Sequence, residues 1–297
     1  MPAMPQSRLT AHRRTRTAFA QADVIALIVL VLVFGVVVIF LLPGRTSPRD
    51  QPRRVRCAIG LMVIGQGSAL YASENNDIWP IVAHMPADEA GTGRVHYTPG
   101  RIGQDRDRDT TEADTDVSTT RNLWLLMRYD YAVETMFVCP ETSDISNRDA
   151  NPEDFWDFAS YSEVSYGYQV PFGQHGRPHS DLDMRMAVAA DKGPFSAALE
   201  TGAAGPGVPT ADLTSSDRDW RPWNSPNHGG EGQNVLYVDG NVQWMPTPLA
   251  GVLQDNIYTR WSDDTGGGTQ SPNVRVQGTP PTSNETPFSD TDSLIYP

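Results

Sequence analysis

An uncharged apolar run dominates the N-terminal part of the chain. Residues 24–42 read VIALIVLVLVFGVVVIFLL, 19 residues that carry no charge and no polar stripe of the kind a buried core helix would show. At ~1.5 Å per helical residue the run extends about 28 Å, close to the ~30 Å hydrocarbon core of a bilayer. A cleaved secretory signal is the alternative, but its apolar region usually has about 7–15 residues before a small-residue cleavage site. This run is longer and ends in Leu-Pro-Gly-Arg, so it predicts a transmembrane helix within residues 19–42.

The apolar pattern then breaks and resumes with helical spacing. Residues 43–52 contain Pro43, Gly44, Pro48 and Pro52. Because an interior proline removes a backbone hydrogen bond and clashes with the preceding turn, this stretch predicts a break in the helix. Apolar and small residues then recur every three to four positions, which predicts an amphipathic helix over residues 53–77. These positions are Cys57, Leu61, Ile64, Ser68 and Tyr71.

Short elements and long polar loops are expected over residues 78–261. A helix is predicted from a cap at Ser118 or Thr119 to about Arg128, and short strands are predicted at TMFVC and MAVAA. Residues 262–297 hold six large apolar residues in 36, so this tail is expected to be loosely ordered or wrapped over the body. The predicted fold class is therefore α+β, with an N-terminal transmembrane helix, an interrupted soluble helix and a small antiparallel sheet domain.

The stretch NVLYVDGNVQWM predicts a β-hairpin. Two five-residue runs flank Asp239 and Gly240, and Asp-Gly is typical of a two-residue type I′ turn with positive φ at both positions. In that register one face of the hairpin would pack on the soluble helix, and it would carry Val235, Tyr237, Val242 and Trp244. The opposite face would carry Leu236, Val238, Asn241 and Gln243.

Charge is distributed unevenly along the chain. Residues 1–56 sum to +7 and the remaining residues to −20, which gives the net charge of −13. An acidic body repels phosphate backbones, so a nucleic-acid partner is not expected. The presence of 2 cysteines in 297 residues excludes a disulfide-dense scaffold.

The N-terminal stretch TAFAQADVIALIVL resembles the signal of bacterial type IV prepilins. Those signals have a short basic leader, a small residue before the cut, Phe at the first mature position and an acid at the fifth. Here residues 1–18 form the basic leader, Ala18 lies at the cut, Phe19 follows it and Asp23 is fifth, although the family usually has Gly and Glu where Ala18 and Asp23 stand. The resemblance implies cleavage by a prepilin peptidase and pairing of Asp23 with a neighbouring subunit's N-terminal amine. The alternative is that Asp23 caps the helix at the membrane interface.

Further blocks resemble a family of bacterial pseudopilin-like proteins with a prepilin-type processing-associated motif, His, nine residues, then Asp-Gly. The helix RRVRCAIGLMVIGQGSALYASENNDIWP and the segment NLWLLMRYDYAVETMFVCPET resemble two of its blocks. The terminal motif runs from His228 through Gly229 and Gly230 to Asp239 and Gly240, with ten intervening residues instead of nine. The extra residue falls in a Gly-rich turn, where an insertion is tolerated.

This resemblance implies a pilin-like structural subunit of a type II secretion or type IV pilus-like envelope assembly. It would be a single-pass protein of the bacterial cell membrane, with a cytoplasmic N-terminus, an extracytoplasmic outer domain at residues 78–261, and other pilin-like subunits as partners. The alternative is a membrane-anchored extracytoplasmic binding module or hydrolase. No phosphate-cradling loop and no nucleophile elbow occurs in the sequence, so an enzyme is not expected.

The conspicuous polar residues are interpreted as structural. In the predicted hairpin Asp239 forms part of the turn. No third polar group is visible in the sequence to orient His228 as a base, so His228 is expected to bond a loop backbone or pack beside the hairpin. For Cys57 and Cys139 two interpretations remain open, an extracytoplasmic disulfide or two small buried apolar side chains.

No metal or cofactor is expected. The acidic stretches DRDRDT and SDTDS suggest calcium, but neither has the spacing of an EF-hand loop, which favours solvated charge runs. His175 and His179 have zinc-like spacing, but the sequence places no Cys pair or third ligand nearby.

Overall fold

The chain divides into two compact units, residues 1–48 and 49–297. The computed structural model describes residues 25–34, 50–83, 96–97, 102, 106–107, 116–148, 151–196, 205–261, 272–281 and 285–296. In the first unit a helix covers Ile25–Phe34, and its large apolar side chains are exposed. Ala18, Phe19 and Asp23 lie outside the described residues, so the processing site stays a prediction.

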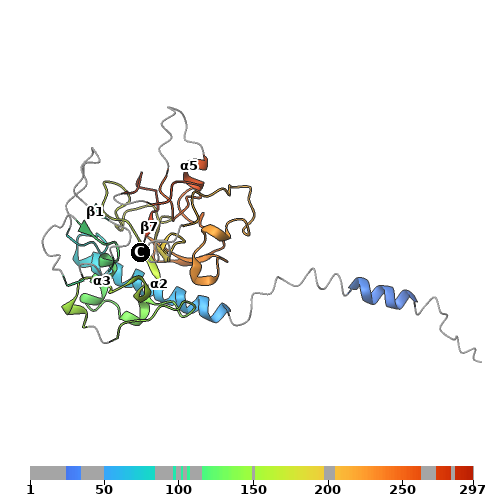
Figure 1. The fold of residues 1–297 in the computed structure, drawn as a ribbon, viewed down its shortest axis with the longest axis horizontal. Coiled ribbons are helices and arrows are strands. Elements are labelled where there is room, and N and C mark those ends of the chain that lie inside the picture. Colours follow the sequence, from blue (N-terminus) through green and yellow to red (C-terminus); the bar gives the residue numbers. More distant parts are fainter. Residues whose placement is uncertain are drawn as a thin grey trace, which may run out of the picture. The chain divides into compact units, whose positions relative to one another are not determined.

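The second unit begins with the longest described helix, α2, which covers Asp50–Glu74 (Figure 1). Pro52 lies in its first turn, where the missing N–H has no intrahelical partner to lose. The predicted break at 43–52 is therefore wrong for residues 50–52, and 43–49 lie outside the described residues. Residues Arg53–Glu74 are long and apolar enough to cross a membrane, but half of their most apolar window is buried inside this unit. The helix is thus a core helix of the unit.

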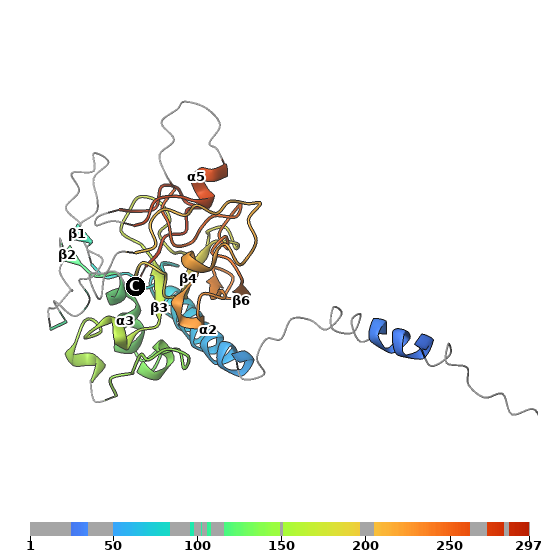
Figure 2. The same cartoon turned by 45° about the vertical axis from the view of Figure 1, so that its right-hand side comes forward.

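A five-stranded sheet forms the centre of the second unit (Figure 2). Its strands are β3 (Tyr166–Gln169), β4 (Ala187–Asp191), β5 (Gln233–Tyr237), β6 (Val242–Met245) and β7 (Ile295–Tyr296). They lie in the order β6-β5-β4-β3-β7, and every neighbouring pair is antiparallel. A separate parallel pair joins β1 (His96–Tyr97) to β2 (Asp116–Val117). The described residues therefore form an α+β fold with an antiparallel sheet, as the sequence predicts.

The remaining elements are short. Helix α3 covers Thr120–Arg128, as predicted, and α5 covers Pro272–Val276. The stretch predicted as the strand TMFVC instead contains the 3₁₀ turn η1, Glu134–Phe137, followed by extended backbone at Val138. Phe137 and Cys139 are both buried, so an alternating burial pattern arises here without a paired strand. The other 3₁₀ turns are η2 (Pro152–Asp154), η3 (Tyr161–Glu163), η4 (Arg221–Trp223) and η5 (Pro226–His228).

Both faces of the sheet are covered, which explains why β4 and β5 are buried along their whole length. One face packs on α2 and α3 through a cluster that includes Leu61, Ile64, Leu123, Val188 and Leu236. The other face is covered by the segments that follow β4 and by the tail, through Trp220, Ile257, Tyr258 and Leu294. Sheet strands buried on both sides lose the apolar–polar alternation that a half-exposed sheet shows.

The C-terminal tail is part of this core. Strand β7 pairs with β3 at the edge of the sheet, and Leu294, Ile295 and Tyr296 are buried. The side-chain oxygen of Gln169 accepts the backbone N–H of Leu294 at 2.7 Å. Of the two alternatives for the tail, residues 285–296 are therefore wrapped over the body and are not loosely ordered.

The hairpin forms where predicted, but in a different register. Leu236 lies opposite Val242, and the loop between the strands has three residues, 238–240. Gly240 adopts φ +80° while Asp239 does not have positive φ, which is the pattern of a type I turn followed by a glycine bulge. The predicted type I′ turn is therefore wrong.

The shift of one residue exchanges the faces of β5. Leu236 points at α2, where an added Cβ on Gly65 would lie 2.8 Å from its Cδ1. Val235 and Tyr237 face the opposite side, and the Tyr237 hydroxyl donates to the carbonyl of Ala250 at 3.1 Å. The predicted grouping of Val235 and Tyr237 with Val242 against the helix is wrong.

Substitution of Gly240 tests the turn. Gly240→Val is expected to lower the free energy of unfolding by about 1–2 kcal/mol, because a β-branched side chain is strained in the left-handed backbone conformation. A Cβ at this position meets nothing within 4 Å, so steric overlap adds little. Gly240→Asn should lose less, because Asn tolerates positive φ. Urea denaturation of the full chain measures both variants, and equal losses for Val and Asn would contradict this assignment.

Candidate functional site: a buried histidine between two carboxylates

His228 is held in position by local backbone geometry. It ends η5, where the Ser225 hydroxyl accepts the N–H of Asn227 at 3.2 Å. Gly229 and Gly230 follow with φ +64° and +75°, so the chain reverses direction before β5 begins. A Cβ on Gly230 would lie 2.9 Å from the Arg221 carbonyl oxygen. The two glycines of the predicted motif therefore form the turn that directs the His228 side chain into the interior, where it is 1% exposed.

Both ring nitrogens of His228 contact carboxylates. Nδ1 bonds a carboxylate oxygen of Glu141, and Nε2 lies 3.1 Å from Oδ2 of Asp191. Burial alone lowers the pKa of His228, but the hydrogen bonds and charges of Asp191 and Glu141 outweigh it, and the pKa lies above its ordinary value. The two carboxylates thus favour the protonated form of the imidazole, against the effect of burial.

Asp191 links three elements around this histidine. It ends β4, is fully buried, and its Oδ2 accepts the backbone N–H of Asn234 at 2.6 Å. The Asn227 side chain donates to Oδ1 at 3.4 Å. The Tyr258 hydroxyl donates to the backbone carbonyl of Asp191 at 2.7 Å. The carboxylate therefore joins η5, β4 and β5 at one point.

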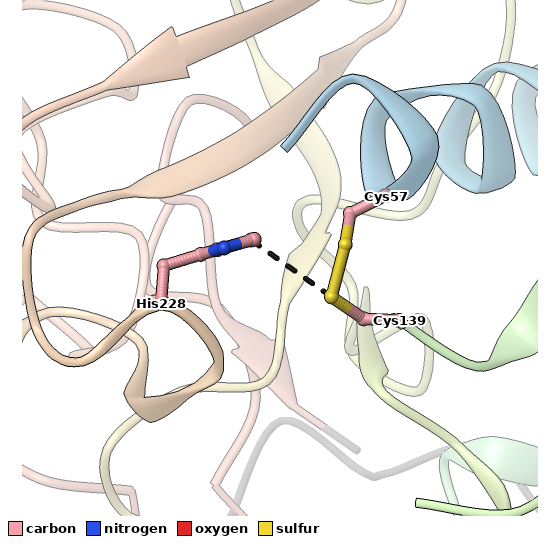
Figure 3. A group of neighbouring side chains, drawn as sticks. All are labelled: Cys57, Cys139 and His228. Carbon is pink, nitrogen blue, oxygen red and sulfur yellow. Dashed lines mark hydrogen bonds between the residues drawn. A yellow bond between two sulfur atoms is a disulfide. The ribbon is translucent and has the colours of Figure 1, made fainter. Parts of the chain in front are cut away.

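A disulfide lies near the same ring nitrogen that approaches Asp191. Cys57 of α2 and Cys139 are bonded, and both residues are fully buried (Figure 3). Cys139 Sγ lies 4.0 Å from Nε2 of His228. Of the two interpretations left open by the sequence, the structure has the disulfide. It also places Glu141, two residues beyond Cys139, against the histidine.

Among the described residues, one group of side chains has ligand atoms close enough to hold a metal ion, and it consists of Cys57, Cys139 and His228. The two sulfur atoms and a ring nitrogen of His228 lie within 4.8 Å of one another. A thiolate is the metal-binding form of cysteine, and a disulfide provides none. His175 and His179 are not in this group. His175 Nδ1 pairs with Asp290, while His179 Nδ1 accepts the N–H of Asp181.

An aromatic and ionic layer covers the histidine toward α2. The ring of Trp244 meets His228 edge-to-face, with centroids 5.2 Å apart. The guanidinium carbon of Arg54 lies 4.0 Å from the centre of the Trp244 ring, a cation–π arrangement. Arg54 also pairs with Glu231. These residues cover the imidazole ring, whose side chain is 1% exposed.

The fold separates the two polar residues of the predicted motif. Asp239 is exposed in the hairpin turn, and its carboxylate accepts the N–H of Asn241 at 2.9 Å. The partners of His228 are Glu141 and Asp191, which sequence reasoning missed. Both ring nitrogens of His228 therefore lie against carboxylates, and the two neighbouring sulfurs are bonded to each other.

The acidic stretch SDTDS is not a solvated charge run. Asp290 is exposed and pairs with His175, but Asp292 and Ser293 are fully buried. Oδ2 of Asp292 accepts the backbone N–H of Phe288 at 2.6 Å, and burial raises its pKa to about 7. The predicted solvated charge run is therefore wrong at Asp292, whose carboxylate instead bonds the backbone of the tail. Of DRDRDT, only residues 106–107 are described.

No family model, curated protein or solved structure matches this chain at a significant level. The resemblance to pilin-like proteins therefore rests on the sequence blocks alone.

Proposed function

We propose that this protein is a pilin-like, membrane-anchored structural subunit of an envelope assembly of the type II secretion or type IV pilus kind. The apolar run at residues 24–42 would anchor it in the bacterial membrane. The disulfide between Cys57 and Cys139 supports an extracytoplasmic position for the second unit, because disulfides persist in oxidising compartments. The His228 cluster supports a structural role, since its polar groups are used within the fold.

The observation that carries the proposal is a second apolar face on α2. At 100° per residue, one face of this helix turns into the core and the opposite face carries four exposed apolar side chains. They are Val55, Ile59, Met62 and Leu70, which are 58%, 46%, 42% and 56% exposed. Surface helices normally place polar residues on the solvent side, and apolar side chains gathered on that side, here with the exposed Gln66 between Met62 and Leu70, favour a contact surface. We name these four residues the α2 stripe and propose that it packs against a neighbouring subunit.

Photo-crosslinking tests this assembly in bacterial membranes. A benzophenone amino acid at position 62 is expected to give covalent oligomers that contain this chain or a related subunit, while the same group at the exposed Asp217 gives none. Ile59→Asp should reduce the crosslinking at least tenfold and leave the unfolding free energy within about 0.5 kcal/mol, because the site is exposed.

The matched control is Ile145→Asp, which makes the same change at an exposed apolar residue of another segment. It is expected to leave the crosslinking unchanged. Equal crosslinking from positions 62 and 217, or equal loss in the two aspartate variants, would contradict a packing role for the α2 stripe.

A further inference from the structure

Reduction of the disulfide would place two thiol groups beside the ring of His228. The sulfurs of Cys57 and Cys139 and a ring nitrogen of His228 lie within 4.8 Å of one another, and all three residues are buried. Figure 3 shows the imidazole directed at the sulfur of Cys139, from which Nε2 is 4.0 Å away. Thiolate and imidazole are typical zinc ligands in proteins. In the thiol form, the cluster therefore offers three side chains that can bind zinc.

The spacing of these atoms is close to that around a single zinc ion. With Zn–S bonds of about 2.3 Å and Zn–N bonds of about 2.1 Å, tetrahedral geometry separates a sulfur from a nitrogen ligand by about 3.6 Å and two sulfurs by about 3.8 Å. The 4.0 Å between Nε2 of His228 and the sulfur of Cys139 is already near the first value. The two sulfurs must move apart after the bond between them is broken, and rotation about their Cα–Cβ bonds allows this.

Glu141 orients the histidine ring for this role. Its carboxylate bonds Nδ1, and Nε2 is the nitrogen that faces the sulfur of Cys139. Histidines that bind metals normally donate their other ring N–H to a carboxylate or carbonyl, which fixes the tautomer and the direction of the ring. Glu141 follows Cys139 by two positions, so one short segment supplies both a sulfur ligand and the group that orients the histidine.

Asp191 provides an oxygen for the fourth position of a tetrahedral site. Its Oδ2 lies 3.1 Å from Nε2 of His228, and nitrogen and oxygen ligands of one zinc ion are about 3.3 Å apart. A nitrogen that binds a metal carries no proton, so this carboxylate can then bond the metal in place of the ring. Asp191 is not one of the three residues whose ligand atoms lie within 4.8 Å of one another, so its carboxylate must turn toward the sulfurs.

We propose that the reduced chain binds one zinc ion through Cys57, Cys139 and His228, and that the zinc ion and the disulfide are alternative links between α2 and the segment that carries Glu141. Cysteines enter a chain as thiols during synthesis, so the zinc form precedes the disulfide. A phosphine reductant converts the disulfide and one water molecule into two thiols and a phosphine oxide. Zinc then displaces the two thiol protons and any proton on Nε2. The ligands lie in the buried cluster that α2 forms with the sheet, so the site does not depend on the α2 stripe or on the proposed assembly.

Titration of the reduced full chain with Co²⁺, a spectroscopic substitute for zinc, tests the site. Because both cysteines are buried, the untagged chain is reduced with a phosphine in urea and returned to oxygen-free detergent buffer, once without metal and once with it. Thiolate-to-cobalt charge-transfer absorption is expected to saturate at one ion per chain at about 10 µM protein and to disappear when zinc is added. The oxidised chain should show no such absorption. Its absence from the reduced chain under both conditions, or equal absorption from the oxidised chain, would overturn the proposal.

Variants identify the ligands. His228→Gln should weaken Co²⁺ binding by about 100-fold or more, and Glu141→Gln by roughly tenfold with the same absorption spectrum, because partners that orient a metal ligand typically contribute about 10–100-fold. Thermal unfolding of the oxidised variants checks that both are folded. His175→Gln, at a histidine that pairs with Asp290 outside the cluster, is the matched control and should bind like the wild type. Equal affinities of His228→Gln and His175→Gln for Co²⁺ would exclude His228 as a ligand and overturn the assignment.

Discussion

Replacement of both Cys57 and Cys139 by alanine is expected to lower the free energy of unfolding by about 4–5 kcal/mol. The disulfide closes a loop with a sequence separation of 82, and the loss of chain entropy in the unfolded state grows with loop length. It also joins the N-terminal half of α2 to the segment that carries Glu141, so its removal loosens one partner of His228. Urea denaturation of the full chain in detergent, followed by tryptophan fluorescence, measures the change.

Reduction provides the control for this prediction. Treatment of the wild type with dithiothreitol should give nearly the same loss as the double alanine variant, and the variant itself should not respond to the reductant. Single Cys→Ala variants should resemble the double variant, because each breaks the same bond. A double variant within 1 kcal/mol of the wild type would show that the bond contributes little to stability.

The hairpin shows how far the sequence alone predicts local structure. Asp-Gly between two apolar runs correctly locates the turn, because Gly240 is needed at positive φ in both the predicted and the observed turn. The choice between these turns depends on tertiary contacts. Leu236 packs on Gly65 of α2, while the Tyr237 hydroxyl reaches Ala250 on the opposite face. Neither contact is visible from the hairpin sequence, and together they favour the register in which Leu236 faces the helix.

The candidate site shows a different limit. The sequence indicates His228, its two glycines and both cysteines, which are the residues that local motifs mark. Its partners are distant: Glu141 lies 87 residues before the histidine, and Asp191 is brought to it by the pairing of β4 with β5. Many acidic residues occur in this chain, and sequence pattern alone does not distinguish the two that pair with His228. One local signal is that Glu141 follows Cys139 by two positions.

Asp191→Ala is expected to destabilise the second unit by about 3–5 kcal/mol. The substitution removes one of the two carboxylates that contact the buried His228 ring and leaves Glu141 as the other. It also removes the acceptor for the backbone N–H of Asn234, which is buried in β5. Asp191→Asn is the matched control, because it retains an acceptor for that N–H and should lose less. Similar unfolding free energies for Asp191→Ala and the wild type would contradict the central position of this carboxylate.

The same cluster predicts a dependence of stability on pH. Because the pKa of His228 in the folded protein lies above its ordinary value of 6.5, the folded state holds a proton that the unfolded state releases. The resulting stabilisation is fully present below pH 6.5 and is lost as the pH rises through the folded pKa. The buried Asp292, with a pKa of about 7, also makes stability fall with rising pH, mainly between about pH 4 and 7. Asp292 is present in both the wild type and His228→Gln, so subtracting their free energies of unfolding removes its contribution. This difference in free energy, measured by urea denaturation, should shrink from pH 6 to pH 9. A difference that stays constant or grows over this range would mean that His228 is neutral in the folded protein.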